Sequence, residues 1–108
     1  MYTLKEKDNI SALIDSEALL LLQFGSGSCA PCAAIKNKID KFSETHPALR
    51  AVYVPIEEVP RLAAQYDVFT VPCILLFAQG RMSIRQAGYF SLQELLQRVQ
   101  RYYELLEL

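Results

Sequence analysis

Residues 18–32 read ALLLLQFGSGSCAPC: an apolar run, a turn of small residues, and two cysteines. The run from Ala18 to Phe24 is short and continuous, which is typical of a strand buried on both faces. Leucine alone would equally permit a helix, but the length of the run and the following Gly25 and Gly27 favour a strand and a turn. We therefore expect the fold to be built around this strand.

An amphipathic helix is predicted from Cys29 to about Glu44. Its apolar residues recur at helical spacing among lysines and are Ala33, Ala34, Ile35, Ile39 and Phe42. His46 and Pro47 mark its end. The two cysteines therefore lie at the start of a helix that follows a buried strand.

Strands and helices continue to alternate downstream. Ala51 to Ile56 is rich in β-branched and aromatic residues and predicts a strand. Val59 to Tyr66 carries a short helical pattern that tolerates Pro60 in its first turn. Ile74 to Ala78 and Met82 to Ala87 flank a short turn and predict an antiparallel hairpin.

A last amphipathic helix is expected after Ser91, an N-cap with Glu94 three residues on, as in a capping box. Its apolar stripe comprises Leu92, Leu95, Leu96, Val99, Tyr102, Tyr103 and Leu106. A weaker helical pattern runs from about Lys7 to Ile14. These elements predict an α/β fold class, with a mixed central β-sheet and helices on both faces. Crossovers should give parallel pairing, and the short turn one antiparallel edge.

Length and composition narrow the classes of protein that fit. The 108 residues have the size of one domain, so we expect a single domain over 1–108. The formal net charge is −1 with interleaved signs, which gives no indication of nucleic-acid binding. The start is polar, without a secretory signal, and no apolar run approaches the roughly 20 residues of a membrane span. We expect a cytoplasmic, monomeric protein without a membrane or nucleic-acid partner.

The segment Cys29-Ala30-Pro31-Cys32 places two thiols where free backbone N–H groups and the helix dipole stabilise a thiolate. Cys29 is the expected attacking thiol. Cys32, one turn along, is the expected resolving thiol that attacks the mixed disulfide. Pro31 fixes φ in the first turn and lacks an N–H that the helix would not use. The pattern predicts cycling between dithiol and disulfide without a cofactor or a metal.

Other interpretations of the cysteines stay open. A CxxC pair is also half of a metal site, although one further cysteine and one histidine supply a four-ligand zinc site poorly. Cys73 is either a small buried residue or an alternative resolving thiol. It is also a possible third ligand, with Cys29 and Cys32, for zinc, copper(I) or an iron–sulfur cluster.

Three polar residues outside the pair are expected to have structural roles. His46 lies at a helix end, where it should contact free carbonyls or solvent rather than a metal. Glu57 and Glu58 precede a helix start, where acidic residues are favoured by the dipole and are expected to cap.

From about Ala18 to the end, the chain resembles the thioredoxin family. The strand, the CxPC at a helix start, Val71-Pro72, the hairpin, Gly88 and the last helix follow the family's order. The resemblance implies a thioredoxin-like fold and thiol–disulfide oxidoreductase activity, as a protein-disulfide reductase recharged by a separate reductase. It also implies that Pro72 is cis and that its loop, with the backbone of Val71, lies against the cysteine pair and receives a substrate strand.

Several positions depart from the family pattern. Gln23 stands where the resemblance implies a buried aspartate beneath the second cysteine, and Tyr53 where it implies that acid's lysine partner. Because glutamine cannot accept a proton at neutral pH, we expect slower resolution of mixed disulfides. Gly25 and Ser28 replace tryptophans, and Cys73 replaces a threonine. These losses favour the alternative of a low-turnover thioredoxin-like binding module.

Overall fold

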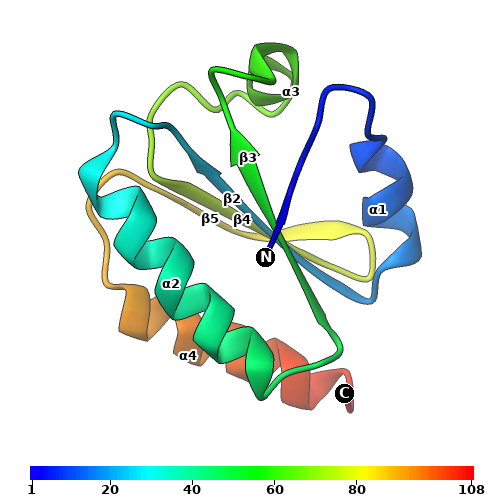
Figure 1. The fold of residues 1–108 in the computed structure, drawn as a ribbon. Helices are drawn as coiled ribbons and strands as arrows, with labels where there is room; N and C mark the ends of the chain where they lie inside the picture. Colours follow the sequence, from blue (N-terminus) through cyan, green and yellow to red (C-terminus); the bar gives the residue numbers. More distant parts are fainter.

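A five-stranded sheet lies between two layers of helices in the computed structural model, which describes residues 1–108 (Figure 1). The strands are β1 (Tyr2–Thr3), β2 (Leu19–Gly25), β3 (Leu49–Pro55), β4 (Cys73–Ala78) and β5 (Arg81–Ala87). The helices are α1 (Ile10–Ser16), α2 (Ala30–Glu44), α3 (Pro60–Gln65) and α4 (Leu92–Leu105). The strand order is β1-β3-β2-β4-β5. The predicted fold class, a mixed sheet with helices on both faces, is confirmed.

β2 lies at the centre of the sheet, and all its residues are buried. Leu20, Leu22 and Phe24 join the core cluster that also contains residues of α1 and α3. Leu19 and Leu21 join the other cluster, together with residues of α2 and α4. The leucine run is therefore continuous because each side of the strand faces a separate apolar core.

β4 and β5 form the predicted antiparallel edge. The expectation that the crossovers give parallel pairing is wrong for the connection through α3, because β4 also pairs antiparallel with β2. Only β1 with β3 and β3 with β2 are parallel. The six residues of α3 rise by only about 9 Å. The seven-residue β3 spans about 23 Å, so α3 alone does not return the chain along it. β4 starts at the end of the sheet where β3 finishes, because Cys73 pairs with Phe24 and Pro55 pairs with the adjacent Gly25.

The N-terminal segment differs from the sequence-based expectation in two ways. Tyr2 and Thr3 form a short edge strand that pairs with β3, and a strand of this length carries no detectable periodicity. α1 starts at Ile10 rather than at Lys7, because Asn9 is its N-cap and its side-chain oxygen accepts the Ala12 N–H at 3.1 Å.

The predicted hairpin and last helix are both confirmed. Gln79 and Gly80 form the β4–β5 turn with φ of 52° and 79°, as a type I′ turn requires at both central residues. The Ser91 hydroxyl oxygen accepts the Glu94 N–H at 3.2 Å and caps α4. None of the helices has the length and apolar character needed to cross a membrane.

Candidate active site

The two cysteines of the CxPC segment lie at the junction of β2 and α2. Cys29 is the N-cap residue of α2, and Pro31 occupies the first turn, as predicted. The structure holds Cys29 and Cys32 as a disulfide, with their Cα atoms 5.4 Å apart. Cys32 is only 1% exposed, whereas Cys29 is partly exposed. Cys29 is therefore the sulfur that a partner molecule can reach.

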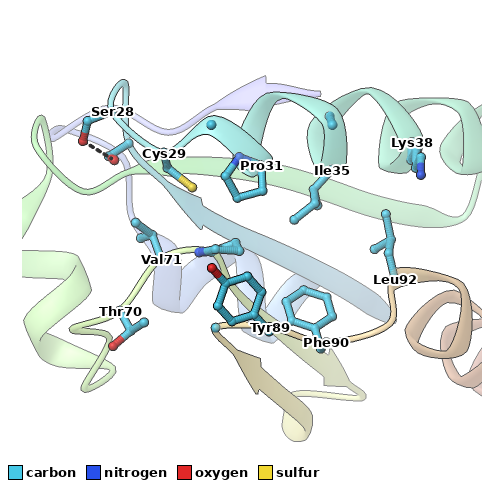
Figure 2. A pocket seen from close by; sticks show the side chains of 15 residues that line it. Ser28, Cys29, Pro31, Ile35, Lys38, Thr70, Val71, Tyr89, Phe90 and Leu92 are labelled. Carbon is cyan, nitrogen blue, oxygen red and sulfur yellow. Dashed lines mark hydrogen bonds between the residues drawn. The ribbon is translucent and has the colours of Figure 1, made fainter.

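A groove of about 570 Å³ opens beside Cys29 (Figure 2). Val71 and Pro72 line it, and the peptide bond between them is cis, as the resemblance implied. The Pro72 carbonyl accepts the N–H of Gly88 at 2.9 Å, so the loop before β4 is tied to the segment after β5. The groove thus brings together three segments that are distant in the sequence.

Two aromatic residues missed by the sequence analysis form the groove wall opposite α2. Figure 2 shows Tyr89 and Phe90 on the side facing Pro31 and Ile35. Tyr89 is fully exposed. The available signal was an aromatic pair directly after a glycine at the end of a strand, but only packing shows that it faces α2. Lys38 is the single charged residue among those that line the groove.

Gln23 is the only fully buried polar side chain in the chain. Its Nε2 donates a hydrogen bond to the carbonyl oxygen of Cys32 at 2.9 Å. The other amide atom, Oε1, is buried and has no partner. The structure therefore places Gln23 directly against the second cysteine of the pair, at the position where the resemblance implied a buried aspartate.

Tyr53 is the β3 residue in register with Gln23, but its ring lies over Gly25. A Cβ atom at Gly25 would lie 2.9 Å from Tyr53 Cε1, so the ring occupies the space that a side chain would need. Lys36 Nζ lies 4.7 Å from the ring centroid, a cation–π distance. Burial raises the pKa of Tyr53, and the charges of Glu57 and Glu58 raise this pKa further.

Glu57 supports the turn that precedes Cys29. Its Oε2 accepts the backbone N–H of Gly27 at 2.7 Å, which joins the β2–α2 turn to the segment after β3. The expectation that Glu57 and Glu58 cap α3 is wrong, because Val59 is the N-cap and no side chain bonds to the helix start. The backbone N–H of Gly27 needs an acceptor within the tight turn, and Glu57 provides that acceptor instead of capping α3.

A family model described as thioredoxin matches residues 1–101. The chain belongs to the thioredoxin family. Thioredoxin-2 of Pyricularia oryzae is 32% identical over 80 residues, covering 74% of this chain but only 47% of that protein. The thioredoxin-like protein YdfQ of Bacillus subtilis is 24% identical over 110 residues, covering 96% and 98% of the two chains. The structure of Fasciola hepatica thioredoxin superposes with a TM-score of 0.84 at 22% identity, covering 94% and 99%.

Membership of the thioredoxin family, together with the Cys29–Cys32 disulfide, supports thiol–disulfide oxidoreductase activity for this chain. The curated relatives named above are themselves called thioredoxin or thioredoxin-like. The matched stretch spans about half of the Pyricularia protein, so properties of that longer protein as a whole are not carried over to this chain.

Cys73 lies apart from the redox pair of this thioredoxin-family chain. It is completely buried and belongs to the apolar cluster on the α1 and α3 side of the sheet, together with its register partner Phe24. Burial raises the pKa of its thiol. No group of three or more Cys, His, Asp or Glu side chains is arranged to hold a metal ion. The three-thiolate alternative and the alternative resolving thiol therefore find no support, and the small buried residue fits.

His46 has the structural role that the sequence predicted. Its Nδ1 lies 2.7 Å from the carbonyl oxygen of Phe42, and its ring stacks on the Phe42 ring at 3.8 Å. Its Nε2 forms a hydrogen bond with the side chain of Gln100. The residue joins the end of α2 to α4 and lies outside the residues that line the groove.

Proposed function

We propose that this chain is a protein-disulfide reductase that acts as one domain over residues 1–108. The observation that carries the proposal is the partly exposed Cys29 at the start of α2, disulfide-bonded to the buried Cys32 and open to a groove. In the reduced protein, the Cys29 thiolate attacks one sulfur of a substrate disulfide. A mixed disulfide forms and the other substrate sulfur leaves as a thiolate.

Cys32 completes the reaction. Its thiol loses a proton and attacks the Cys29 sulfur, which releases the second substrate thiolate and leaves the Cys29–Cys32 disulfide seen in the structure. Two electrons have then passed to the substrate, and a separate dithiol reductase must return them. No cofactor or metal enters either step. The cytoplasmic location, the monomeric state and the lack of nucleic-acid or membrane partners stay predictions.

The groove supports a protein substrate rather than a small thiol. Val71 and Pro72 line one side of it, where the backbone of Val71 would pair with an extended substrate segment. The exposed Tyr89 offers a flat apolar surface, although the family's tryptophans are missing. Ala30 and Pro31 line the α2 side of the groove beside Cys29. Their side chains are small, and the proline ring restricts the backbone there.

Gln23 should limit the second step. Because an amide cannot take the Cys32 proton, resolution depends on solvent or on a base from outside the buried site. We expect Gln23→Asp to raise the single-turnover rate of mixed-disulfide resolution about tenfold. A quench-flow measurement that gives an unchanged rate in a folded variant would rule out proton transfer as the limiting process.

Insulin reduction with dithiothreitol as electron donor tests the proposal. Wild type is compared with Cys29→Ser, Cys32→Ser and Cys73→Ser, the last as a matched control that also replaces one sulfur. We expect Cys29→Ser and Cys32→Ser to abolish turnover and Cys73→Ser to retain it. Wild-type activity no higher than the dithiothreitol background would contradict the proposal and favour the binding-module alternative.

A further inference from the structure

One buried polar atom of the site is without a hydrogen-bond partner. Gln23 Nε2 donates to the Cys32 carbonyl oxygen at 2.9 Å. Since a carbonyl oxygen only accepts, this bond fixes the orientation of the amide and identifies the unpartnered atom as Oε1. In the disulfide state, the Oε1 atom of Gln23 therefore accepts no hydrogen bond from the protein. A buried acceptor without a donor lowers the stability of a fold.

The unpartnered oxygen lies close to the resolving cysteine. The geometry of an amide separates its oxygen and nitrogen by about 2.2 Å, so Oε1 lies within about 5 Å of the Cys32 carbonyl oxygen. Gln23 and Cys32 are 0% and 1% exposed, so bulk solvent does not reach either side chain. In the disulfide, the Cys32 sulfur has no proton and cannot donate to Oε1.

The register neighbour of Gln23 does not fill this role. The Tyr53 ring lies over Gly25, and no hydrogen bond joins its hydroxyl to Gln23. Gln23 is also the only fully buried polar side chain of the protein, so no other buried side chain competes for Oε1. No side chain of the protein therefore donates to Oε1 in the disulfide state.

We propose that Oε1 of Gln23 accepts a hydrogen bond from the Cys32 thiol when the disulfide is reduced, which makes Gln23 a redox-dependent positioning residue. Reduction breaks the Cys29–Cys32 bond with two electrons and two protons and leaves one thiol on each cysteine. The electrons come from a dithiol such as dithiothreitol or, in the reaction on which this inference rests, from the reductase. The new S–H is the missing donor.

The proposed hydrogen bond favours the dithiol state over the disulfide state. The bond to Oε1 exists only in the dithiol state, so it stabilises that state relative to the disulfide and raises the midpoint potential. A buried carboxylate would instead take the proton from Cys32. The Gln23 amide leaves the proton on the sulfur, which keeps Cys32 a thiol until a mixed disulfide has formed on Cys29.

The test is redox equilibration of wild type and Gln23→Met in mixtures of reduced and oxidised dithiothreitol. The dithiol fraction is quantified by alkylation and mass spectrometry. Methionine keeps the length of the side chain and removes the amide. We expect the equilibrium constant for reduction to fall about tenfold, which is a midpoint about 30 mV more negative. Leu21→Met, on the same strand and face, is the matched control and should stay within twofold of wild type.

A folded Gln23→Met variant whose equilibrium constant stays within twofold of wild type would overturn the inference. If this variant does not fold, the side-chain carbonyl carbon shift of Gln23 is measured by NMR in oxidised and reduced wild type. A shift change at Gln23, with none at the exposed Gln65, supports the new bond, and no change at Gln23 overturns it. Neither readout requires turnover, so a shifted midpoint without insulin reduction would contradict only the proposed function.

Discussion

Cys32 and Cys73 are two buried thiol positions on opposite faces of the same sheet. Cys32 is 1% exposed, is bonded to Cys29 and has the Gln23 amide against its backbone. Cys73 is 0% exposed and belongs to an apolar cluster. Burial is therefore nearly equal at the two sites. What separates a redox thiol from an inert one here is a reachable partner sulfur and a polar neighbour.

Strand alternation explains why Cys73 is excluded from the site although it follows Pro72 directly. Pro72 lines the groove, whereas Cys73 is the first residue of β4 and lies in the cluster on the α1 and α3 side. Successive side chains of a strand point to opposite faces. Adjacency in the sequence thus places Cys73 next to the groove-lining residue but away from the groove.

Thiol reactivity should show the largest difference between the two sites. In the reduced protein at neutral pH, we expect iodoacetamide to modify Cys29 at least roughly 100-fold faster than Cys73, because only the former is accessible and stabilised as a thiolate. Peptide mass spectrometry of timed samples measures both rates. Equal modification rates of Cys29 and Cys73 in the native protein would contradict the assignment of Cys73 to the core.

Substitutions of Cys73 should change the free energy of unfolding according to how well the new side chain fits an apolar site. Cys73→Ser places a hydroxyl in the apolar cluster without a partner, and we expect it to lower the free energy of unfolding by about 1–3 kcal/mol. Cys73→Val keeps the site apolar and should cost less than about 1.5 kcal/mol. Urea unfolding of the oxidised proteins compares them, and a serine variant as stable as the valine variant would argue for a polar surrounding.

The surroundings of the Cys29–Cys32 pair can be tested at Gly25, where the Tyr53 ring lies over β2. A methyl group there meets the Tyr53 ring, so we expect Gly25→Ala to lower the free energy of unfolding by about 1–3 kcal/mol. In a Tyr53→Leu background the same change should cost less than half as much, because the ring is gone. Denaturant unfolding of the four proteins gives the coupling energy. Additive effects would show that Tyr53 does not require glycine at this position.

The smallest expected effect is a pH dependence of stability from Cys73. Burial raises the pKa of this thiol above its value in the unfolded chain. The resulting stabilisation is fully present below the ordinary thiol pKa of about 8.5 and is lost as pH rises through the folded value. In the oxidised protein, where the other two cysteines do not titrate, the loss of stability from pH 8 to pH 10 should be smaller in Cys73→Val. An identical slope in the two proteins would contradict this.

The parts of the fold that carry local signals could be predicted from the sequence. β2 and α2 follow from the unbroken leucine run and from helical periodicity, and the α4 cap follows from Ser91 and Glu94. The direction of β4 and the presence of β1 could not be predicted. The first depends on how far α3 can carry the chain, and the second on pairing of a two-residue edge with β3.

In the candidate site, too, features with a local sequence signal could be predicted and contacts between distant residues could not. The CxPC pair was visible as a motif, and the positions of Gln23 and Pro72 followed from resemblance to a family rather than from local pattern. Contacts between distant residues stayed hidden. The Glu57–Gly27 bond joins residues 30 positions apart, and Tyr89 faces α2 only because the segment after β5 folds against it.

Trapping the mixed disulfide tests the central claim most directly. Reduced Cys32→Ser protein is incubated with a peptide disulfide, quenched with acid and digested, and the site of attachment is determined by mass spectrometry. We predict that the substrate sulfur is bound to Cys29 and that Cys73 is recovered as a free thiol. Attachment at Cys73, or no adduct at Cys29 in folded protein, would contradict the account.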